Sequence, residues 1–435
     1  MLKGLTDHPQ RYALTNELHA RPFQPLRAPG RVLYIAFKLS DDPAARDPEA
    51  IRAHLLAFID RHGAPHPAPD ADHYLHDFGG FRLKWERHTE FISYSLYDEG
   101  AAEGLFVNGL SQQLPTDWLE RAPGAVIAAA KIEVLATTSM EEAGQIIEGR
   151  LSRAFNPESL VVARVLDGQS HALADFRIDG EGFSRFAMVV QNDAGARRIG
   201  RLVQRLLEIE TYRTIAMLAL PVAREANATL NRIEREMTRL ADLVAADESG
   251  EQEGTILTEL TALSAELEAL AATTAFRFGA AEAYEALVNQ RIRSISEERY
   301  IGRQLFAEFM TRRFEPAMRT CSAAERRLGG LALRASRIAE LVRTRVDVAV
   351  ESQNQKLLAS MDRRAALQLR LQKTVEGLSV VAISYYAVSL GSYVIAPIAE
   401  WVDVSKELLT ALIALPVMGL VYWLVSRVRR RLGGV

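Results

Sequence analysis

The sequence predicts an α+β cytoplasmic domain, followed by a long helical stalk or bundle and a two-helix transmembrane hairpin. Strand-type runs and most of the prolines fall within residues 1–195. Residues 196–376 show helical apolar spacing and almost no strand pattern. Two apolar segments without charge follow at 377–399 and 408–426, and a basic tail of residues 427–435 ends the chain. These four stretches are the predicted domains.

The composition excludes some classes of function. The chain has 435 residues and a formal net charge of −3. This balance argues against nucleic acid as a partner, because phosphate binding needs a concentrated basic surface. The single cysteine, Cys321, excludes an intrachain disulfide and is expected to be a packing residue on a helix. Phosphate-loop, dinucleotide-binding and nucleophile-elbow motifs are missing, so no cofactor is evident and an enzyme is the least favoured class.

The pattern of residues 1–195 predicts a mixed domain in which strands alternate with a few helices. Residues 49–62 have helical spacing, and the Pro-rich piece 62–72 is typical of a surface loop. Apolar or alternating runs bounded by turn residues predict strands. These strands cover residues 31–39, 81–97, 125–136, 159–166, 171–178 and 184–191.

The second part predicts long helices that pack as an antiparallel bundle or a coiled-coil stalk. Pro221 should kink or end the first helix, because proline removes a backbone donor. An acidic turn at 247–254 precedes a return helix. Residues 280–373 then read as helix, with interruptions at Pro316 and at Gly329-Gly330. Glu208 and Tyr212, one helical turn apart, indicate a polar contact between helices.

The charges around the apolar segments predict their orientation. Each segment is close to the roughly 20 residues that a transmembrane helix needs. The connecting loop carries Glu400, Asp403 and Glu407 against a single Lys406. Basic residues stand outside the hairpin: Arg363, Arg364, Arg370 and Lys373 before it, and Arg427, Arg429, Arg430 and Arg431 after it. Because cationic flanks stay in the cytoplasm, both termini and the large domain are expected there, with the acidic loop outside.

Four stretches of the chain resemble a bacterial family of uncharacterized membrane-anchored proteins. They are HPQRYALTNELHARPF (8–23), FRLKWERHTEF (81–91), QRLLEIETYRTIAMLALPVA (204–223) and TVEGLSVVAISYY (374–386). The resemblance spans the chain from end to end. It implies anchoring in a bacterial inner membrane, with lipid as a partner, and it supplies no activity.

The order of the parts is similar to that of the CorA-type magnesium channels, which are pentamers whose first span lines the pore. This resemblance implies a homo-oligomer, such as a pentamer, that acts as a cation channel or transporter. The Gly-Met-Asn signature of those channels reads Gly391-Ser392-Tyr393 here, so the asparagine that holds a hydrated ion is missing. The alternative is a membrane-anchored scaffold or sensor whose cytoplasmic domain binds a protein or a small ligand.

Two sets of polar residues in the first part are candidates for a site. The first set is Asn16, Glu17, His19 and Arg21, and the second is Glu86, His88 and Glu90. The second set alternates along a predicted strand and should share one face. Together the two sets can form a His/carboxylate site for a divalent metal. No segment has strong ligand spacing, so a polar network that ties the N-terminal arm to the strand is the favoured interpretation.

The first apolar segment carries small and hydroxyl-bearing residues on one stripe. Gly377, Ser384 and Gly391 recur every seven residues, and Ser389 and Tyr393 lie nearby. Such a stripe permits close packing between helices. It can alternatively line a polar pore. Close packing is the favoured interpretation, and the pore remains the alternative.

Overall fold

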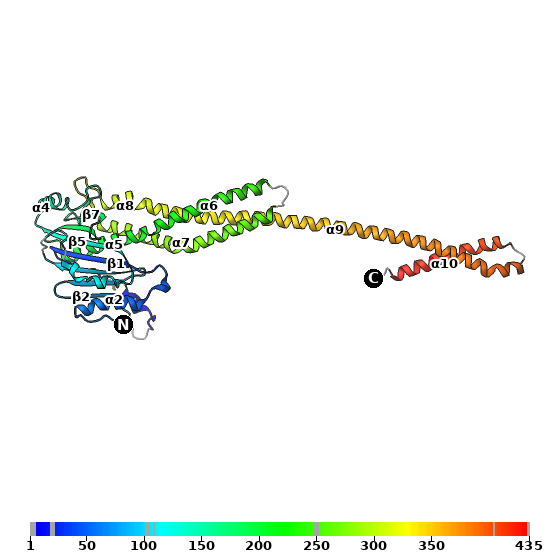
Figure 1. Cartoon of the computed structure of the whole chain (residues 1–435), viewed down its shortest axis with the longest axis horizontal. Helices are drawn as coiled ribbons and strands as arrows, with labels where there is room; N and C mark the ends of the chain where they lie inside the picture. The colour runs from blue at the N-terminus through cyan, green and yellow to red at the C-terminus, as the bar shows by residue number, and fades with distance from the viewer. Residues whose placement is uncertain are drawn as a thin grey trace. The chain divides into compact units, whose positions relative to one another are not determined.

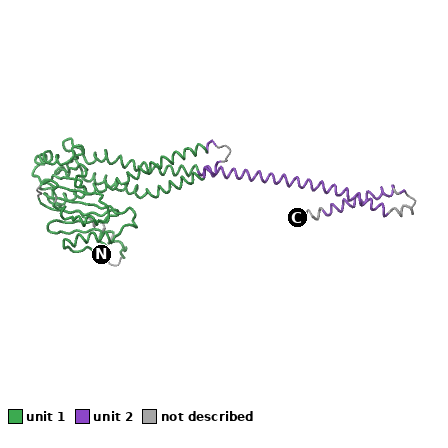
Figure 2. Tube along the Cα trace, in the orientation of Figure 1, with its two compact units in different colours: residues 1–243, 258–338 green, residues 244–257, 339–435 purple. Residues whose placement is uncertain are grey.

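A computed structural model of the chain describes residues 6–17, 22–100, 104–107, 109–246, 252–402 and 405–432. His19, Arg21 and Asp403 lie outside these ranges. The chain divides into two compact units, and each is considered by itself (Figure 2). The first unit comprises residues 1–243 and 258–338, and the second comprises residues 244–257 and 339–435.

The first unit is built on a nine-stranded mixed sheet of order β2-β3-β4-β1-β5-β8-β7-β6-β9 (Figure 1). Among the described strands, β5 and β8 are the one parallel pair, and the other neighbours run antiparallel. The strands are β1 Gly30–Lys38, β2 His73–Asp77, β3 Arg82–Arg87, β4 Phe91–Glu99, β5 Ala125–Thr137, β6 Val161–Val165, β7 Ser170–Ile178, β8 Ser184–Gln191 and β9 Glu298–Arg299.

Helices cover both faces of this sheet. The described helical elements are α1 Arg11–Glu17, α2 Pro48–Arg61, α3 Thr116–Leu119, α4 Met140–Gln145, α5 Ala196–Met217, α6 Ala219–Ala246, α7 Glu253–Ile295, α8 Phe306–Arg313, α9 Glu315–Val402 and α10 Lys406–Leu432, with short turns η1 Pro43–Ala45, η2 Gly109–Gln113 and η3 Ile146–Leu151. One face packs against α2 and α3 at one end and against α4 and η3 at the other. The opposite face packs against α5, α7, α8 and the beginning of α9.

Strand alternation explains the two cores, because successive side chains of a strand point to opposite faces. In β1, Leu33 and Phe37 enter the cluster that includes Phe58 of α2. Val32 and Ala36 of the same strand enter the cluster formed with α5. The predicted mixed domain with strands and long helices is therefore confirmed in its coarse form.

Helices α5, α6, α7 and the first part of α9 follow the predicted helical spacing. The break after α5 falls at Leu218, and Pro221 occupies the first turn of α6, where a missing backbone donor costs little. The expected effect of Pro221 is thus confirmed. Ion pairs between Arg232 and Glu266 and between Arg239 and Glu259 join α6 to α7.

Two predicted elements were wrong. Residues 81–97 are not one strand but the hairpin of β3 and β4, which pair antiparallel around a turn at 88–90. Residues 280–373 are not one helix, because α7 ends at Ile295 and β9 then pairs with β6 at the edge of the sheet. Pro316 lies in the first turn of α9, where proline is tolerated, and Gly329-Gly330 does not interrupt that helix.

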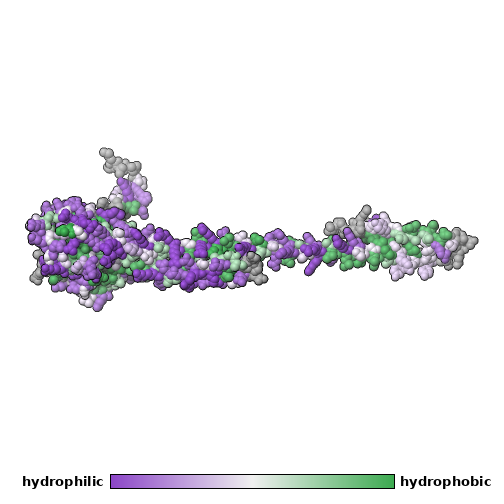
Figure 3. All heavy atoms as spheres, turned by 90° about the horizontal axis from the view of Figure 1, so that it is seen from above, coloured by the Kyte–Doolittle hydropathy of each residue, from purple (hydrophilic) through white to green (hydrophobic). Residues whose placement is uncertain are grey.

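The second unit contains the last part of α9 together with α10. Both helices are long and apolar enough to cross a membrane, with windows of mean hydropathy 1.4 in α9 and 2.2 in α10. Their apolar side chains are largely exposed, as for Leu378 at 75% and Leu412 at 71%. Figure 3 shows hydrophobic surface over these two helices. Gly391 of α9 lies close to α10, because a Cβ at that position would meet Ile413 at 3.9 Å.

Candidate functional site

A row of polar side chains forms the floor of a cavity in the first unit. The antiparallel register places Tyr34 of β1 opposite Ser95 of β4, and Ser95 opposite Lys84 of β3. The next row toward the turn contains Glu86 and Ser93. Because residues two apart in a strand share a face, both rows point toward the helical layer of α5 and α7. The short serine side chains leave space above the sheet that a larger residue would fill.

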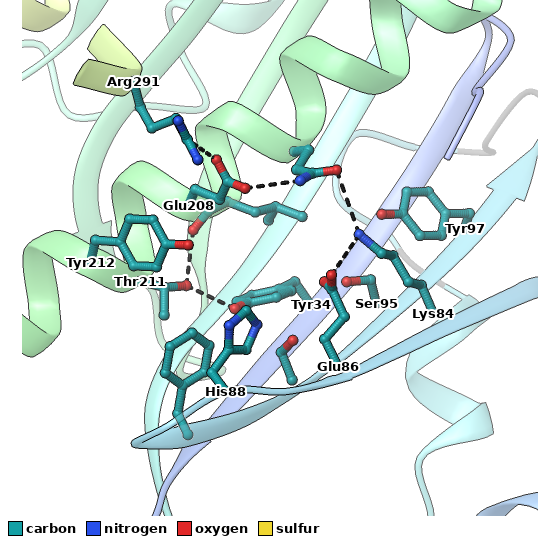
Figure 4. Close-up of a pocket in the computed structure, with 14 residues that line it drawn as sticks. Tyr34, Lys84, Glu86, His88, Ser95, Tyr97, Glu208, Thr211, Tyr212 and Arg291 are labelled. Carbon is teal, nitrogen blue, oxygen red and sulfur yellow. Dashed lines mark hydrogen bonds and ion pairs between the residues drawn. The ribbon is translucent and has the colours of Figure 1, made fainter. Parts of the chain in front are cut away.

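Helices α5 and α7 supply the roof of this cavity, which has a volume of about 240 Å³ (Figure 4). Gln204, Glu208, Thr211 and Tyr212 lie on α5, one or two turns apart, so that they share one face. Arg291 comes from α7. The side chains at the edge are those of His88 and Phe91, whose rings stack with their centroids 4.1 Å apart.

A chain of polar contacts links the floor to the roof. Lys84 Nζ lies 2.9 Å from Glu86 Oε1 and 3.5 Å from Gln204 Oε1. Gln204 Nε2 donates to Glu208 Oε1 at 2.9 Å, and Arg291 Nε pairs with the other oxygen of Glu208. Figure 4 shows this chain running from β3 across α5 to α7. The cavity thus holds two cations and two carboxylates, already arranged as pairs.

Three tyrosines in the cavity keep their protons. Burial raises the pKa of Tyr34, and the hydrogen bond that Thr211 Oγ1 donates to its hydroxyl at 2.8 Å only partly opposes this. Burial likewise raises the pKa of Tyr97 and of Tyr212 well above the usual value for a phenol. Neutral phenols can donate a hydrogen bond as well as accept one. The site therefore offers hydroxyl donors between fixed charges.

The polar groups of the lining can bind a ligand. Within the described ranges, no group of three or more His, Cys, Asp and Glu side chains is placed to hold a metal ion. Cys321 is buried in the core, and burial raises the pKa of its thiol. The cavity has hydrogen-bond donors and acceptors on both its floor and its roof, and such groups can fix the orientation of a polar ligand.

The structure separates the candidate residues of the first part. Glu86 and His88 line the cavity. Glu90, the last residue of the hairpin turn, is buried elsewhere and pairs with Arg277 of α7 at 2.9 Å. The three residues therefore do not share one strand face, because the turn intervenes. Asn16 and Glu17 lie on α1, and His19 and Arg21 fall outside the described residues.

The candidate residues of the hairpin also differ in their surroundings. Ser384 is buried, whereas Tyr393 is 80% exposed. Gly377 is exposed and Ser389 is half-buried on α9. Of the three loop acids, Glu400 belongs to α9 and Glu407 to the first turn of α10, where it is exposed, while Asp403 lies outside the described ranges.

Several lining residues escaped the sequence analysis. Tyr34, Ser95 and Lys84 come together only through the register of β1, β4 and β3, which no local pattern reveals. Glu208 and Tyr212 did carry a signal, because their spacing indicated a polar contact between helices. The contact exists, as Glu208 pairs with Arg291 and the ring of Tyr212 lies 5.5 Å from that of Tyr284.

Fold and cavity together define a protein with a mixed-sheet domain, a polar pocket under its helical layer and two C-terminal helices able to span a membrane. The chain belongs to the family described as "Protein of unknown function (DUF3422)", whose model matches residues 6–432. This confirms the resemblance to a family of unknown function over nearly the whole chain. No curated protein and no solved structure matches the chain. The similarity to CorA-type channels stays a prediction.

Proposed function

We propose that this protein is anchored in a bacterial inner membrane by α9 and α10 and that its sheet domain is a sensor for a small polar ligand. The single observation that carries the proposal is the cavity of about 240 Å³ with its balanced polar lining. Basic residues flank the hairpin on both sides, and the loop that connects its two helices is acidic. This distribution of charge favours a cytoplasmic position for the sheet domain and for both termini.

The charges of the cavity favour a ligand without net charge. Lys84 and Arg291 are matched by Glu86 and Glu208, so a net anion or cation would leave one pair uncompensated. A zwitterion or a polyol can exchange hydrogen bonds with each pair and with the phenols. At about 30 Å³ per water molecule, the volume holds roughly eight waters or a ligand of about ten non-hydrogen atoms.

Thermal unfolding of the full-length protein in detergent tests this proposal. A panel of zwitterionic amino acids and small polyols is added, and tryptophan fluorescence reports unfolding. A ligand at about a hundred times its Kd should stabilise the protein by about 2.7 kcal/mol. Tyr34→Phe should reduce that shift, because it removes a hydroxyl in the cavity.

Tyr74→Phe is the matched control, since its hydroxyl donates to Pro65 O at 2.7 Å and does not line the cavity. The proposal is wrong if no compound stabilises the wild-type protein. It is equally wrong if both phenylalanine variants reduce the shift to the same extent.

A cation channel or transporter is the second candidate, and it is favoured by the continuity of α9. This helix is continuous from Glu315 to Val402 and contains the first apolar segment. In a homo-oligomer such as a pentamer, several copies would enclose an axial path. Gly377 and Tyr393 are the exposed members of the stripe available to line that path, while Glu400, Asp403 and Glu407 would concentrate cations at its mouth.

Proteoliposomes test the channel. Wild-type protein of confirmed oligomeric mass should pass mono- or divalent cations under an imposed potential. Neutralising the three loop acids should lower this flux. If the wild-type protein passes no cation, the channel is excluded and the sensor remains.

A further inference from the structure

A second group of charged side chains lies on the opposite face of the sheet from the cavity. The parallel register of β5 and β8 places Lys131 directly opposite Arg185. On β1 and β5, Arg31 stands opposite Glu133 in the next row. Lys131 and Glu133 are only 4% exposed, although both carry charge. Burial of charge at the centre of a sheet is costly and needs a compensating partner.

This group lies between the described α-helices of its face, and the short turn η2 contributes Ser111 and Gln112 to its surroundings. The helices on this face form two separate apolar clusters, one with α2 and α3 and the other with α4 and η3. The pair β5–β8 joins the two halves of the sheet between those clusters. Here the surface is hollowed to a crevice of about 630 Å³, lined by Phe106, Lys131, Asp179, Glu181 and Arg185 among others.

Among the described residues, neither cation has a strong ion-pair partner. Lys131 pairs with Glu181, whose side chain is 71% exposed and therefore screened by solvent. Arg185 lies 3.9 Å from Asp179, beyond hydrogen-bond distance. Asp179 Oδ1 is already occupied, because it accepts the backbone N–H groups of Glu181 and Phe183.

The guanidinium of Arg185 is nevertheless held in place. Its centre lies 5.6 Å from the ring of Phe106 and 5.9 Å from the ring of Phe155. Its Nε is buried and has no hydrogen-bond partner among the described residues. A guanidinium held by aromatic rings, with an unpartnered Nε, is suited to an anion, which a guanidinium can bind with two parallel hydrogen bonds.

We infer that this crevice binds a small anionic ligand, whose carboxylate or phosphate group bridges Lys131 and Arg185. Two cations on directly opposite strand positions repel each other, and an anion between them removes that repulsion. The ligand takes the place of the exposed Glu181 carboxylate at Lys131. Glu133 does not fill this role, because it faces Arg31 and accepts the backbone N–H of Phe106 at 3.3 Å. The crevice is separate from the cavity under α5 and does not depend on the ligand proposed there.

Isothermal titration of the full-length protein in detergent at low salt tests the inference, with inorganic phosphate and succinate as the probes. Tighter binding of one probe identifies the phosphate or the carboxylate as the preferred group. Arg185→Met keeps most of the side-chain volume and should weaken binding about tenfold or more, the scale of a lost charge-assisted hydrogen bond. Glu181→Gln should tighten binding by about threefold, because it removes an exposed competing carboxylate.

Glu259→Gln is the matched control, since Glu259 is an exposed partner of Arg239 in the α6–α7 hairpin and lies outside the crevice. It should leave the Kd unchanged. If Arg185→Met does not fold, the tighter binding expected for Glu181→Gln, against the unchanged Kd of the control, still decides the question. The inference is overturned if the wild-type protein binds neither probe, or if Glu181→Gln behaves as the control does.

Discussion

Replacement of Glu90 by glutamine should destabilise the sheet domain, because Glu90 neutralises two buried cations. Its Oε2 lies 2.9 Å from an Nη atom of Arg277 and 3.3 Å from Lys38 Nζ. The side chains of Glu90 and Arg277 are 5% and 6% exposed. This cluster ties α7 to the start of β4, so its loss should loosen the helical layer from the sheet.

The magnitude follows from what remains after the substitution. Removal of one partner of a buried ion pair costs about 3–5 kcal/mol, since the other charge stays buried. Asp41 still contacts both cations, at 2.5 Å from Arg277 and 2.6 Å from Lys38, but it is 63% exposed. We therefore expect a loss at the low end of the range, about 3 kcal/mol. Asp41→Asn should cost less than about 1 kcal/mol, as for an exposed pair.

Urea unfolding followed by tryptophan fluorescence measures this loss, because Trp85 and Trp118 are buried in the sheet domain. A double-mutant cycle with Arg277→Met isolates the interaction between Glu90 and Arg277. The double variant should be more stable than the sum of the single losses implies. A loss below about 1 kcal/mol for Glu90→Gln, or strict additivity in the cycle, would refute the reasoning.

Three further predictions concern protonation, packing and orientation. Burial lowers the pKa of His54 and of His171 to about 4. In His54 the hydrogen bond that Nε2 donates to the backbone oxygen of Trp118 only partly opposes this shift, and in His171 the charge of Arg164 reinforces it. The unfolded chain, with a histidine pKa of about 6.5, then binds more protons, so stability should fall as the pH drops from about 6.5 to about 4. His171→Leu should flatten the pH dependence of the urea midpoint, and an unchanged slope would contradict this assignment. Gly200→Ala should destabilise the protein by at least about 1–3 kcal/mol, because the new Cβ would lie 1.9 Å from Gln24 O. Gly279→Ala has nothing described within 4 Å of the new Cβ and should stabilise α7 by up to about 1 kcal/mol. Thermal unfolding measures both effects. A reporter that is active only outside the cytoplasm should be silent when fused after Val435, and activity there would exclude the proposed topology.

The sequence predicted elements whose signals are local. The strand expected at 31–39 is β1, Gly30–Lys38, and Pro221 marks the boundary between α5 and α6 as expected. The turn between β3 and β4 escaped because it contains His88, Thr89 and Glu90, none of which is a strong turn former. The end of α7 escaped for a related reason, since the reversal after it has Ser296 and Ile301 at positive φ and only one glycine, Gly302.

The sequence analysis did not predict the candidate sites, because polar positions of a strand become buried when other elements pack against the sheet. Alternation of polar and apolar residues in β3 and β4 indicates a sheet with one face in solvent. In this chain α5 and α7 cover that face, so Lys84 and Glu86 are enclosed in a cavity instead. On the opposite face, Lys131 of β5 is buried at the crevice although the α-helices of that face pack on either side of it. When a set of strands is followed by more amphipathic helices than one face of the sheet can hold, the surplus helices must pack on the polar face. The polar positions of those strands are therefore candidates for interior binding sites.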